Sequence, residues 1–300
     1  MKNSSYFEEI KECKICPRKC KVNRYETPGF CKAKDTLKIA LASLHNWEEP
    51  CISGIKGSGT IFFSYCNLRC VYCQNYEISR GYGKKVSVKR FSDICLELQN
   101  SGAHNINLVT PTHFVPQIIE GINIAKSEGL SIPIVYNTGG YELVNTIKKL
   151  DGIVNIYLTD LKYYDDLYAV KYSNAKDYFK IATKALEEMF NQVGKPLIEN
   201  DIMVKGVIVR ILLLPGLLDD AKKIVKYLYD KYNDKIFISI MNQYTPVIKT
   251  NYEELNKKVD KEDYDELVDY AYDLGIRNAF IQEGDASDTC FIPKFDKRGV

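Results

Sequence analysis

The fold of this 300-residue chain is decided by the stretch Thr60-Ile61-Phe62-Phe63-Ser64-Tyr65-Cys66-Asn67-Leu68-Arg69-Cys70-Val71-Tyr72-Cys73. Its first half is β-branched and aromatic and follows the turn-forming Gly57-Ser58-Gly59, so we predict a buried strand there. Cys66, Cys70 and Cys73 come next at C-x3-C-x2-C spacing, so three thiolates share one short loop. Three thiolates can hold three irons of a four-iron cluster and leave the last iron open. A zinc knuckle would need a fourth ligand and a disulfide would need an oxidising compartment, so both fit less well.

The composition is that of an ordinary globular protein. The 41 basic and 39 acidic residues give a net charge of +2, which offers no reason to expect a nucleic-acid or membrane partner. We find no apolar run of about 18 residues and no signal peptide, so we expect a cytoplasmic protein. Ten cysteines in a reduced chain favour metal binding over disulfides.

Short β-rich runs alternate with amphipathic helical stretches after the cysteine loop, which is typical of a parallel sheet covered by helices. With the strand at Thr60, the predicted strands are Asn107 to Thr110, Pro133 to Asn137, Asn155 to Asp160, Gly206 to Leu214 and Ile236 to Met241. A helix at 261–274 and a short run at 279–282 close the fold. We therefore predict an α/β fold, a partial (β/α)6 barrel over residues 51–300. A full eight-unit barrel is the weaker alternative, because too little chain remains.

Helix ends are marked by small residues. We predict Ser92 as an N-cap, and we expect helices to end at Gly102, Gly129, Gly194 and Gly275.

Polar residues follow nearly every predicted strand. They are Cys66; Thr110, Thr112 and His113; Asn137 and Thr138; Asp160 and Lys162; Asn242 and Gln243. In a barrel of this kind, the working groups lie at the carboxyl ends of the strands. Asn and Thr are also common turn residues, so each one alone is modest evidence for a site.

Residues 1–50 are predicted to be a Cys-rich metal-binding segment and a connector. Cys13, Cys16, Cys20 and Cys31 have C-x2-C-x3-C-x10-C spacing in a stretch too poor in apolar residues to fold alone. Four thiolates suit structural zinc and equally suit a closed auxiliary iron-sulfur cluster, with free thiols as the third reading.

Other residues of these two regions receive structural predictions. Of the remaining cysteines, Cys51 is left unassigned, Cys95 is predicted in the core and Cys290 in a structural role. We expect His45, Trp47, Glu48 and Glu49 to pack the segment against the barrel.

The chain resembles the radical SAM superfamily, and within it the activating enzymes of glycyl radical enzymes, most closely the pyruvate formate-lyase activating enzyme homologues called PflX. The resemblance rests on Gly59 to Phe63 with the cysteine loop, Cys73 to Glu77, Asn105 to His113 and Phe280 to Glu283. It implies an oxidoreductase that cleaves S-adenosylmethionine (SAM) reductively at a 4Fe-4S cluster. The resulting 5′-deoxyadenosyl radical then abstracts hydrogen from a substrate.

The resemblance also implies the residues that hold SAM. Asp160 and Lys162 match an Asp-x-Lys that binds the amino and carboxylate ends of the methionine, although an ordinary salt bridge is the alternative. Tyr72 matches the aromatic residue placed against the adenine. Arg210 aligns with an arginine at the SAM carboxylate or ribose. We predict further polar contacts to SAM from Asn137 and Gln243, and no residue is assigned a catalytic role beyond the cluster and SAM.

Two departures from the family pattern bear on the substrate. Thr110-Pro111-Thr112-His113 stands where those enzymes carry a Gly-Gly-Glu stretch that grips the SAM amino group, and Asn242-Gln243-Tyr244 stands where a histidine is often found. Other partners are therefore expected to hold SAM in this chain.

Three functions remain open at this point. The first substrate hypothesis is a glycine of a partner enzyme, and the second is a small molecule or another protein side chain. A non-catalytic electron-transfer protein is the third reading. For either enzyme we expect an electron donor such as flavodoxin or ferredoxin.

Overall fold

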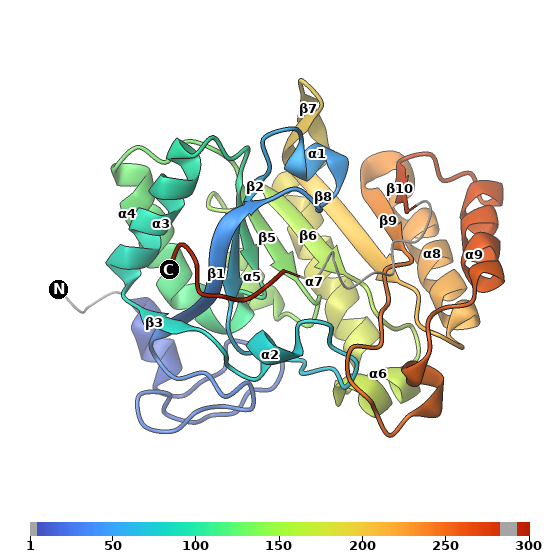
Figure 1. The fold of residues 1–300 in the computed structure, drawn as a ribbon, viewed down its shortest axis with the longest axis horizontal. Helices are drawn as coiled ribbons and strands as arrows, with labels where there is room; N and C mark the ends of the chain where they lie inside the picture. Colours follow the sequence, from blue (N-terminus) through green and yellow to red (C-terminus); the bar gives the residue numbers. More distant parts are fainter. Residues whose placement is uncertain (1–4, 283–292) are drawn as a thin grey trace.

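One large mixed sheet runs through the computed structural model, which describes residues 5–282 and 293–300 (Figure 1). Its parallel strands pair in the order β2 (Ser58–Phe63), β4 (Ile106–Val109), β5 (Ile134–Thr138), β6 (Ile156–Asp160), β8 (Ile202–Leu212), β9 (Phe237–Met241) and β10 (Ala279–Ile281). All six predicted strands are present, and the closing run forms β10. At the other edge, β1 (Leu37–His45) pairs antiparallel with β2 and with β3 (Lys84–Val86). A short β7 (Leu197–Glu199) pairs with β8.

The strand order confirms the predicted α/β partial barrel. Within the described residues the sheet has two edges, β10 and β3, that do not pair with each other. Seven parallel strands arranged in chain order leave the barrel open on one side, so a closed eight-unit barrel is not formed.

The longer helices cover the outer face of the sheet (Figure 1). The longer ones are α3 (Val88–Asn100), α4 (Val115–Ser127), α7 (Tyr178–Val193), α8 (Leu218–Tyr232) and α9 (Lys261–Asp273). The shorter ones are α1 (Pro50–Ser53), α2 (Tyr76–Ser79), α5 (Val144–Lys148) and α6 (Asp166–Ser173), with 3-10 turns η1 (Ser5–Ile10), η2 (Thr112–Phe114), η3 (Asn233–Lys235) and η4 (Glu253–Asn256). None of the helices in the described ranges is long and apolar enough to span a membrane.

The predicted helix ends are partly confirmed. Gly102, Gly129, Gly194 and Gly275 follow α3, α4, α7 and α9 with positive φ, the backbone conformation in which glycine is favoured. The prediction that Ser92 is an N-cap is wrong. Helix α3 begins one turn earlier, where the Ser87 side chain accepts a hydrogen bond from the Arg90 N–H.

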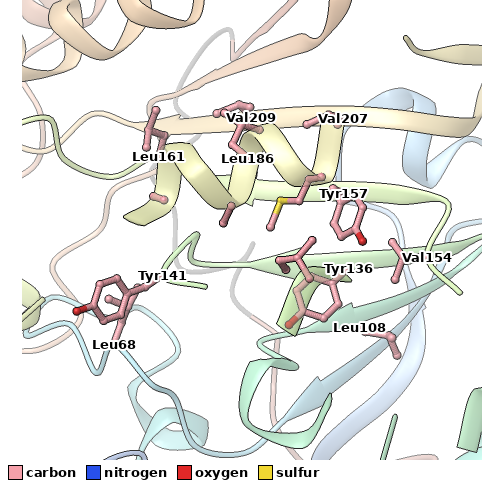
Figure 2. Packing of buried hydrophobic residues seen from close by; sticks show 14 of the residues in the cluster. Leu68, Leu108, Tyr136, Tyr141, Val154, Tyr157, Leu161, Leu186, Val207 and Val209 are labelled. Carbon is pink, nitrogen blue, oxygen red and sulfur yellow. The ribbon is translucent and has the colours of Figure 1, made fainter. Parts of the chain in front are cut away.

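The two faces of the sheet have different neighbours because side chains alternate along each strand. Outward-facing residues such as Tyr136, Tyr157 and Val209 pack in the main core, which also contains Leu186 of α7 (Figure 2). Inward-facing Val135, Leu158 and Ile208 form a separate cluster with Cys51 and Ile52 of α1. The same alternation places Asn137, Asp160 and Arg210 on the inner face.

The amino-terminal region is joined closely to the barrel. Strand β1 lies within residues 1–50, so the sheet begins before the predicted boundary at residue 51. Ile10 and Ile15 are buried in the main hydrophobic core. Whether residues 1–50 fold as a separate unit stays a prediction.

Candidate active site at the mouth of the partial barrel

A cavity of about 770 Å³ opens at the carboxyl ends of the parallel strands. Every residue predicted to bind the SAM cluster or SAM lines it, namely Cys66, Cys70, Tyr72, Cys73, Asn137, Asp160, Lys162, Arg210 and Gln243. These residues are up to 177 positions apart in the sequence, and the shared edge of a parallel sheet brings them together. Thr110 and Thr138 also line the cavity.

The cysteine loop follows β2 directly and turns sharply at Tyr65 and Arg69, both with positive φ. The Leu68 N–H donates to the Cys66 sulfur at 3.3 Å, and the Ser173 hydroxyl donates to the Cys70 sulfur at 2.9 Å. Burial raises the pKa of Cys66 to about 11 and that of Cys73 to about 12, and the neighbouring cysteines add to both shifts. The three sulfurs are therefore close enough to interact electrostatically.

This donor set fits a four-iron cluster. In the described parts of the chain, no group of three or more His, Cys, Asp or Glu side chains converges as the ligands of a single metal ion do. Each thiolate of a four-iron cluster binds its own iron, so the three sulfurs need only face one common space. Cys66, Cys70 and Cys73 meet that requirement, since all three line the same cavity.

Asp160 and Lys162 form an ion pair beside the cysteine loop. The Lys162 Nζ lies 2.6 Å from Asp160 Oδ2. Burial alone would lower the pKa of Lys162, but the Asp160 carboxylate outweighs it, and the net shift is upward. The pair is thus charged, with both side chains partly open to the cavity. It can offer a cation and an anion to a zwitterionic amino acid group.

Glycines and a tyrosine hold this pair in place. The Tyr178 hydroxyl donates to the Gly139 carbonyl at 2.8 Å and accepts from the Lys162 N–H at 3.0 Å. At Gly140 the backbone has φ of +79°, and a Cβ atom there would overlap the Asp160 carbonyl oxygen. The end of β5 can therefore approach β6 this closely only with glycine at residue 140.

Tyr72 lies in the wall of the cavity and is 5% exposed. Its hydroxyl accepts a hydrogen bond from the Tyr163 hydroxyl at 2.8 Å, and its ring packs edge-on against Tyr244. Tyr163 also bonds Ser173, which donates to Cys70, so this network joins Tyr72 to the cysteine loop. Its contact with adenine stays a prediction.

Arg210 has carboxylate partners that the sequence reading did not foresee. Its Nε and Nη2 bond both oxygens of Glu49 at 2.7 and 2.6 Å, and Nη2 also bonds Glu48. Burial opposes ionisation of Glu49, but Arg210 lowers its pKa below the usual value. Glu48 and Glu49 line the cavity and do more than pack two parts together. A contact between Arg210 and SAM stays a prediction.

Gln243 links the cysteine loop to the last strand. Its carbonyl accepts a hydrogen bond from the Gln74 side chain at 2.6 Å, and its side-chain oxygen accepts from Gln282 at 3.2 Å. Asn137 accepts the Thr110 N–H through its backbone carbonyl at 2.8 Å, and the residue lines the cavity. Both residues are placed to contact a molecule in the cavity.

Three other polar residues at predicted strand ends do not line the cavity. The backbone N–H of Asn242 donates a hydrogen bond to the side-chain oxygen of Gln282. His113 is fully enclosed, and its Nε2 lies 2.8 Å from the Ser64 carbonyl oxygen. Burial lowers the pKa of His113 to about 3, so its ring is neutral.

Thr112 contacts a buried acid, Glu142, that the sequence analysis did not identify. Its hydroxyl and that of Thr138 both donate to Glu142 Oε1. Burial raises the pKa of Glu142 to about 7. The only sequence signal was an acidic residue four positions after the end of β5.

The amino-terminal cysteines are mostly enclosed by protein. Cys13, Cys16 and Cys31 are buried, Cys20 is half-buried, and the Phe30 N–H donates to the Cys20 sulfur at 3.2 Å. The thiols of Cys13 and Cys20 both act on the pKa of Cys31, which burial raises. Their metal stays a prediction.

Arg18 connects the two cysteine regions. Its Nε donates to the Asn67 carbonyl at 2.8 Å, and its Nη2 reaches the carbonyls of Leu68 at 3.4 Å and Ser173 at 3.0 Å. Its Nη1 bonds the Asn174 carbonyl, and its guanidinium lies 4.0 Å from the centre of the Phe30 ring.

The remaining cysteines take no part in either region. Cys95 is buried in the core as predicted, and Cys51 is buried in the inner cluster. Cys290 lies outside the described residues.

The chain resembles proteins of known sequence and structure. A protein of Methanocaldococcus jannaschii described as uncharacterized is 28% identical over 275 residues, which cover 87% of this chain and 75% of that protein. SuiB of Streptococcus suis bound to S-adenosylmethionine superposes with a TM-score of 0.50 and 18% identity over 73% of this chain and 48% of SuiB. HydG, a maturase of the FeFe-hydrogenase, superposes with a TM-score of 0.50 and 15% identity over 73% of this chain and 50% of HydG.

These comparisons differ in what they establish. The chain spans about half the length of the two solved structures, and at these identities they support the fold alone. The family profile described as the radical SAM superfamily matches residues 60–228, more than half of the sequence. That match starts within β2, the strand before the cysteine loop, and ends within α8. This chain therefore belongs to the radical SAM superfamily.

Proposed function

We propose that this chain is an enzyme that cleaves SAM reductively and abstracts hydrogen from a protein substrate, a glycine of a partner enzyme being the first candidate. The observation that carries the proposal is the shared cavity, which brings three cysteines and the Asp160–Lys162 pair together. Membership of the superfamily implies a 4Fe-4S cluster and SAM. When bound, they supply one-electron cleavage of SAM to the 5′-deoxyadenosyl radical.

The residues of the chain have separate parts in this proposal. Cys66, Cys70 and Cys73 hold the cluster. Lys162 binds the methionine carboxylate and Asp160 binds the amino group, which orients SAM toward the cysteine loop. Tyr72 lies in the wall of the same cavity. The barrel wall encloses the cavity and limits the access of water to the reacting groups.

The glycine substrate is supported by the family resemblance and by the size of the cavity. A volume of about 770 Å³ at the carboxyl ends of the strands leaves room for a peptide segment beside a cofactor of SAM size. Glu48, Glu49 and Arg210 form a charged wall there that a substrate must match. The substrate is therefore expected to present polar groups to this wall.

Two measurements test the proposal. The protein is reconstituted anaerobically with iron and sulfide and supplied with SAM and dithionite, and 5′-deoxyadenosine is measured. A candidate glycyl radical enzyme is then added, and its glycyl radical is sought by electron paramagnetic resonance. Absence of 5′-deoxyadenosine would exclude SAM cleavage. Its presence without a protein radical would exclude that glycine as substrate and favour a small molecule or another side chain.

A further inference from the structure

A second hollow, of about 500 Å³, lies against the cysteine loop. It is lined by residues 68–71 of that loop, the end of α2, residues 171–174 and the 248–252 segment. Leu68, Cys70 and Ser79 line both this hollow and the active-site cavity. The Cys70 thiol is therefore part of the wall between them, and a cluster held there is close to both spaces.

The second hollow is positively charged. Arg69, Arg80, Lys171 and Lys249 line it, and none of its described lining residues is acidic. Lys171 is paired with Glu254 at 2.6 Å, which leaves three cations with no carboxylate partner within the described residues. Arg80 and Lys249 are exposed. The chain has a net charge of only +2, so this hollow is a local concentration of positive charge.

The wall between the two spaces is held in a fixed position. The Ser173 hydroxyl donates to the Cys70 sulfur at 2.9 Å, and the Val71 N–H donates to the Tyr172 carbonyl at 2.8 Å. Arg18 binds the Asn67 and Ser173 carbonyls from the other side. Because these bonds join α6 to the loop, the basic hollow and Cys70 keep a constant separation.

We propose that this hollow is the docking surface of an acidic one-electron carrier protein. The proposal rests on the proposed function, which needs one electron for each SAM cleaved while SAM and substrate occupy the other cavity. One electron leaves the carrier, which is oxidised, and reduces the cluster bound by Cys70; no atom or proton moves. Opposite charge on the two surfaces accelerates their encounter and fixes its orientation.

The test uses the reconstituted holoprotein and purified acidic flavodoxin as the probe. The variant is Arg80→Glu/Lys249→Glu, which reverses two exposed charges and leaves the cysteine loop intact. The matched control is Lys184→Glu/Lys195→Glu, two exposed lysines that line neither space. Flavodoxin affinity is measured by titration over a range of salt concentrations. Production of 5′-deoxyadenosine is measured with reduced flavodoxin and, separately, with dithionite.

We expect the variant to bind flavodoxin at least roughly ten-fold more weakly at low salt and with a smaller salt dependence, while the control binds like the unaltered protein. Flavodoxin-driven turnover falls with affinity, and dithionite-driven turnover is unchanged. The neutral variant Arg80→Gln/Lys249→Gln shows the same trend with a smaller effect. Equal affinity in the variant and the control overturns the docking surface. Lack of dithionite-driven cleavage in unaltered protein overturns the proposed function, and the titration still decides the docking surface.

Discussion

The two cysteine regions of this chain use the same donor atom in different surroundings. Cys66, Cys70 and Cys73 are partly exposed, follow a barrel strand and face a cavity that also contains an ion pair. In the segment 13–31, three of the four cysteines are buried. Three thiolates beside an open space suit a cluster that takes a further ligand, whereas four thiolates that are mostly enclosed suit a closed site. The surroundings of the cysteines, more than their number, distinguish a cluster site that takes a further ligand from a closed site.

The largest expected effect comes from removing the three thiols of the first region. Replacing Cys66, Cys70 and Cys73 together by alanine should abolish 5′-deoxyadenosine formation while the barrel stays folded, since the strands do not depend on those thiols. Metal analysis of this triple variant then reports the segment 13–31 alone: zinc indicates a structural site, and about four irons with sulfide indicate an auxiliary cluster. Cys95→Ala is the control and should retain cleavage. Cleavage by the triple variant would contradict the assignment of the first region.

A smaller loss is expected from the ion pair beside the cysteine loop of the first region. Lys162→Ala or Asp160→Ala should weaken SAM binding by roughly ten- to a hundred-fold, about 1.5 to 3 kcal/mol, without loss of iron. The reason is that these side chains are proposed to bind the methionine and not the metal. SAM affinity is measured by equilibrium titration. The control is Lys231→Ala, which breaks an exposed pair with Glu187 and should leave SAM affinity unchanged. Equal affinity in all three variants would reduce Asp160–Lys162 to a structural salt bridge.

Glu142 lies between the two cysteine regions and therefore bears on their comparison. The Thr138 hydroxyl, in the cavity wall, donates a hydrogen bond to it, and its negative charge contributes to the raised pKa of Cys16. Burial raises its pKa from 4.5 to about 7. Between these values the folded chain keeps a proton that the unfolded chain releases. Glu142 therefore lowers the free energy of unfolding as pH rises, by up to about 1.4 kcal/mol per unit.

This pH dependence can be isolated by substitution. The stability of wild type relative to Glu142→Gln should fall by roughly 2 kcal/mol as the pH rises from about 4.5 to about 7. Denaturant unfolding at several pH values measures the difference. Glu253→Gln, at an exposed position, is the control and should track wild type. Parallel curves for wild type and Glu142→Gln would show that Glu142 titrates normally.

The smallest effect concerns the close approach of β5 and β6. Gly140→Ala should destabilise the protein by about 1 to 2 kcal/mol more than Gly152→Ala, because both positions have positive φ but only residue 140 meets a backbone carbonyl. Denaturant unfolding measures both losses. Equal losses would mean that the positive φ accounts for the whole effect.

The sequence predicted the strands and most of the cavity because each signal was local. Apolar runs marked the barrel strands, and polar residues after them, such as Asp160 and Lys162, had to meet at one edge of the sheet. Strand β1 was missed because residues 37–45 were grouped with the Cys-rich segment, although their apolar pattern fits a strand. Ser92 was predicted as the cap of this helix, and Ser87, which caps it in the structure, was not considered.

The missed contacts join residues far apart in the chain. Arg210 meets Glu49 across 161 positions, and Arg18 meets Ser173 across 155. Periodicity shows that a side chain faces inward, but it does not name the group that it meets there. The burial that raises the pKa of Glu142 likewise arises only in the folded chain, where hydrogen bonds from Thr112 and Thr138 partly oppose the shift.

Arg18 also sets an order of events during synthesis. Its guanidinium binds the carbonyls of Asn67, Leu68, Ser173 and Asn174, so this junction cannot form until the ribosome has translated at least 174 codons. Until then the nascent cysteine loop lacks the complete set of these Arg18 hydrogen bonds. The loop therefore passes through a stage of biogenesis in which its thiols are less confined than in the finished protein.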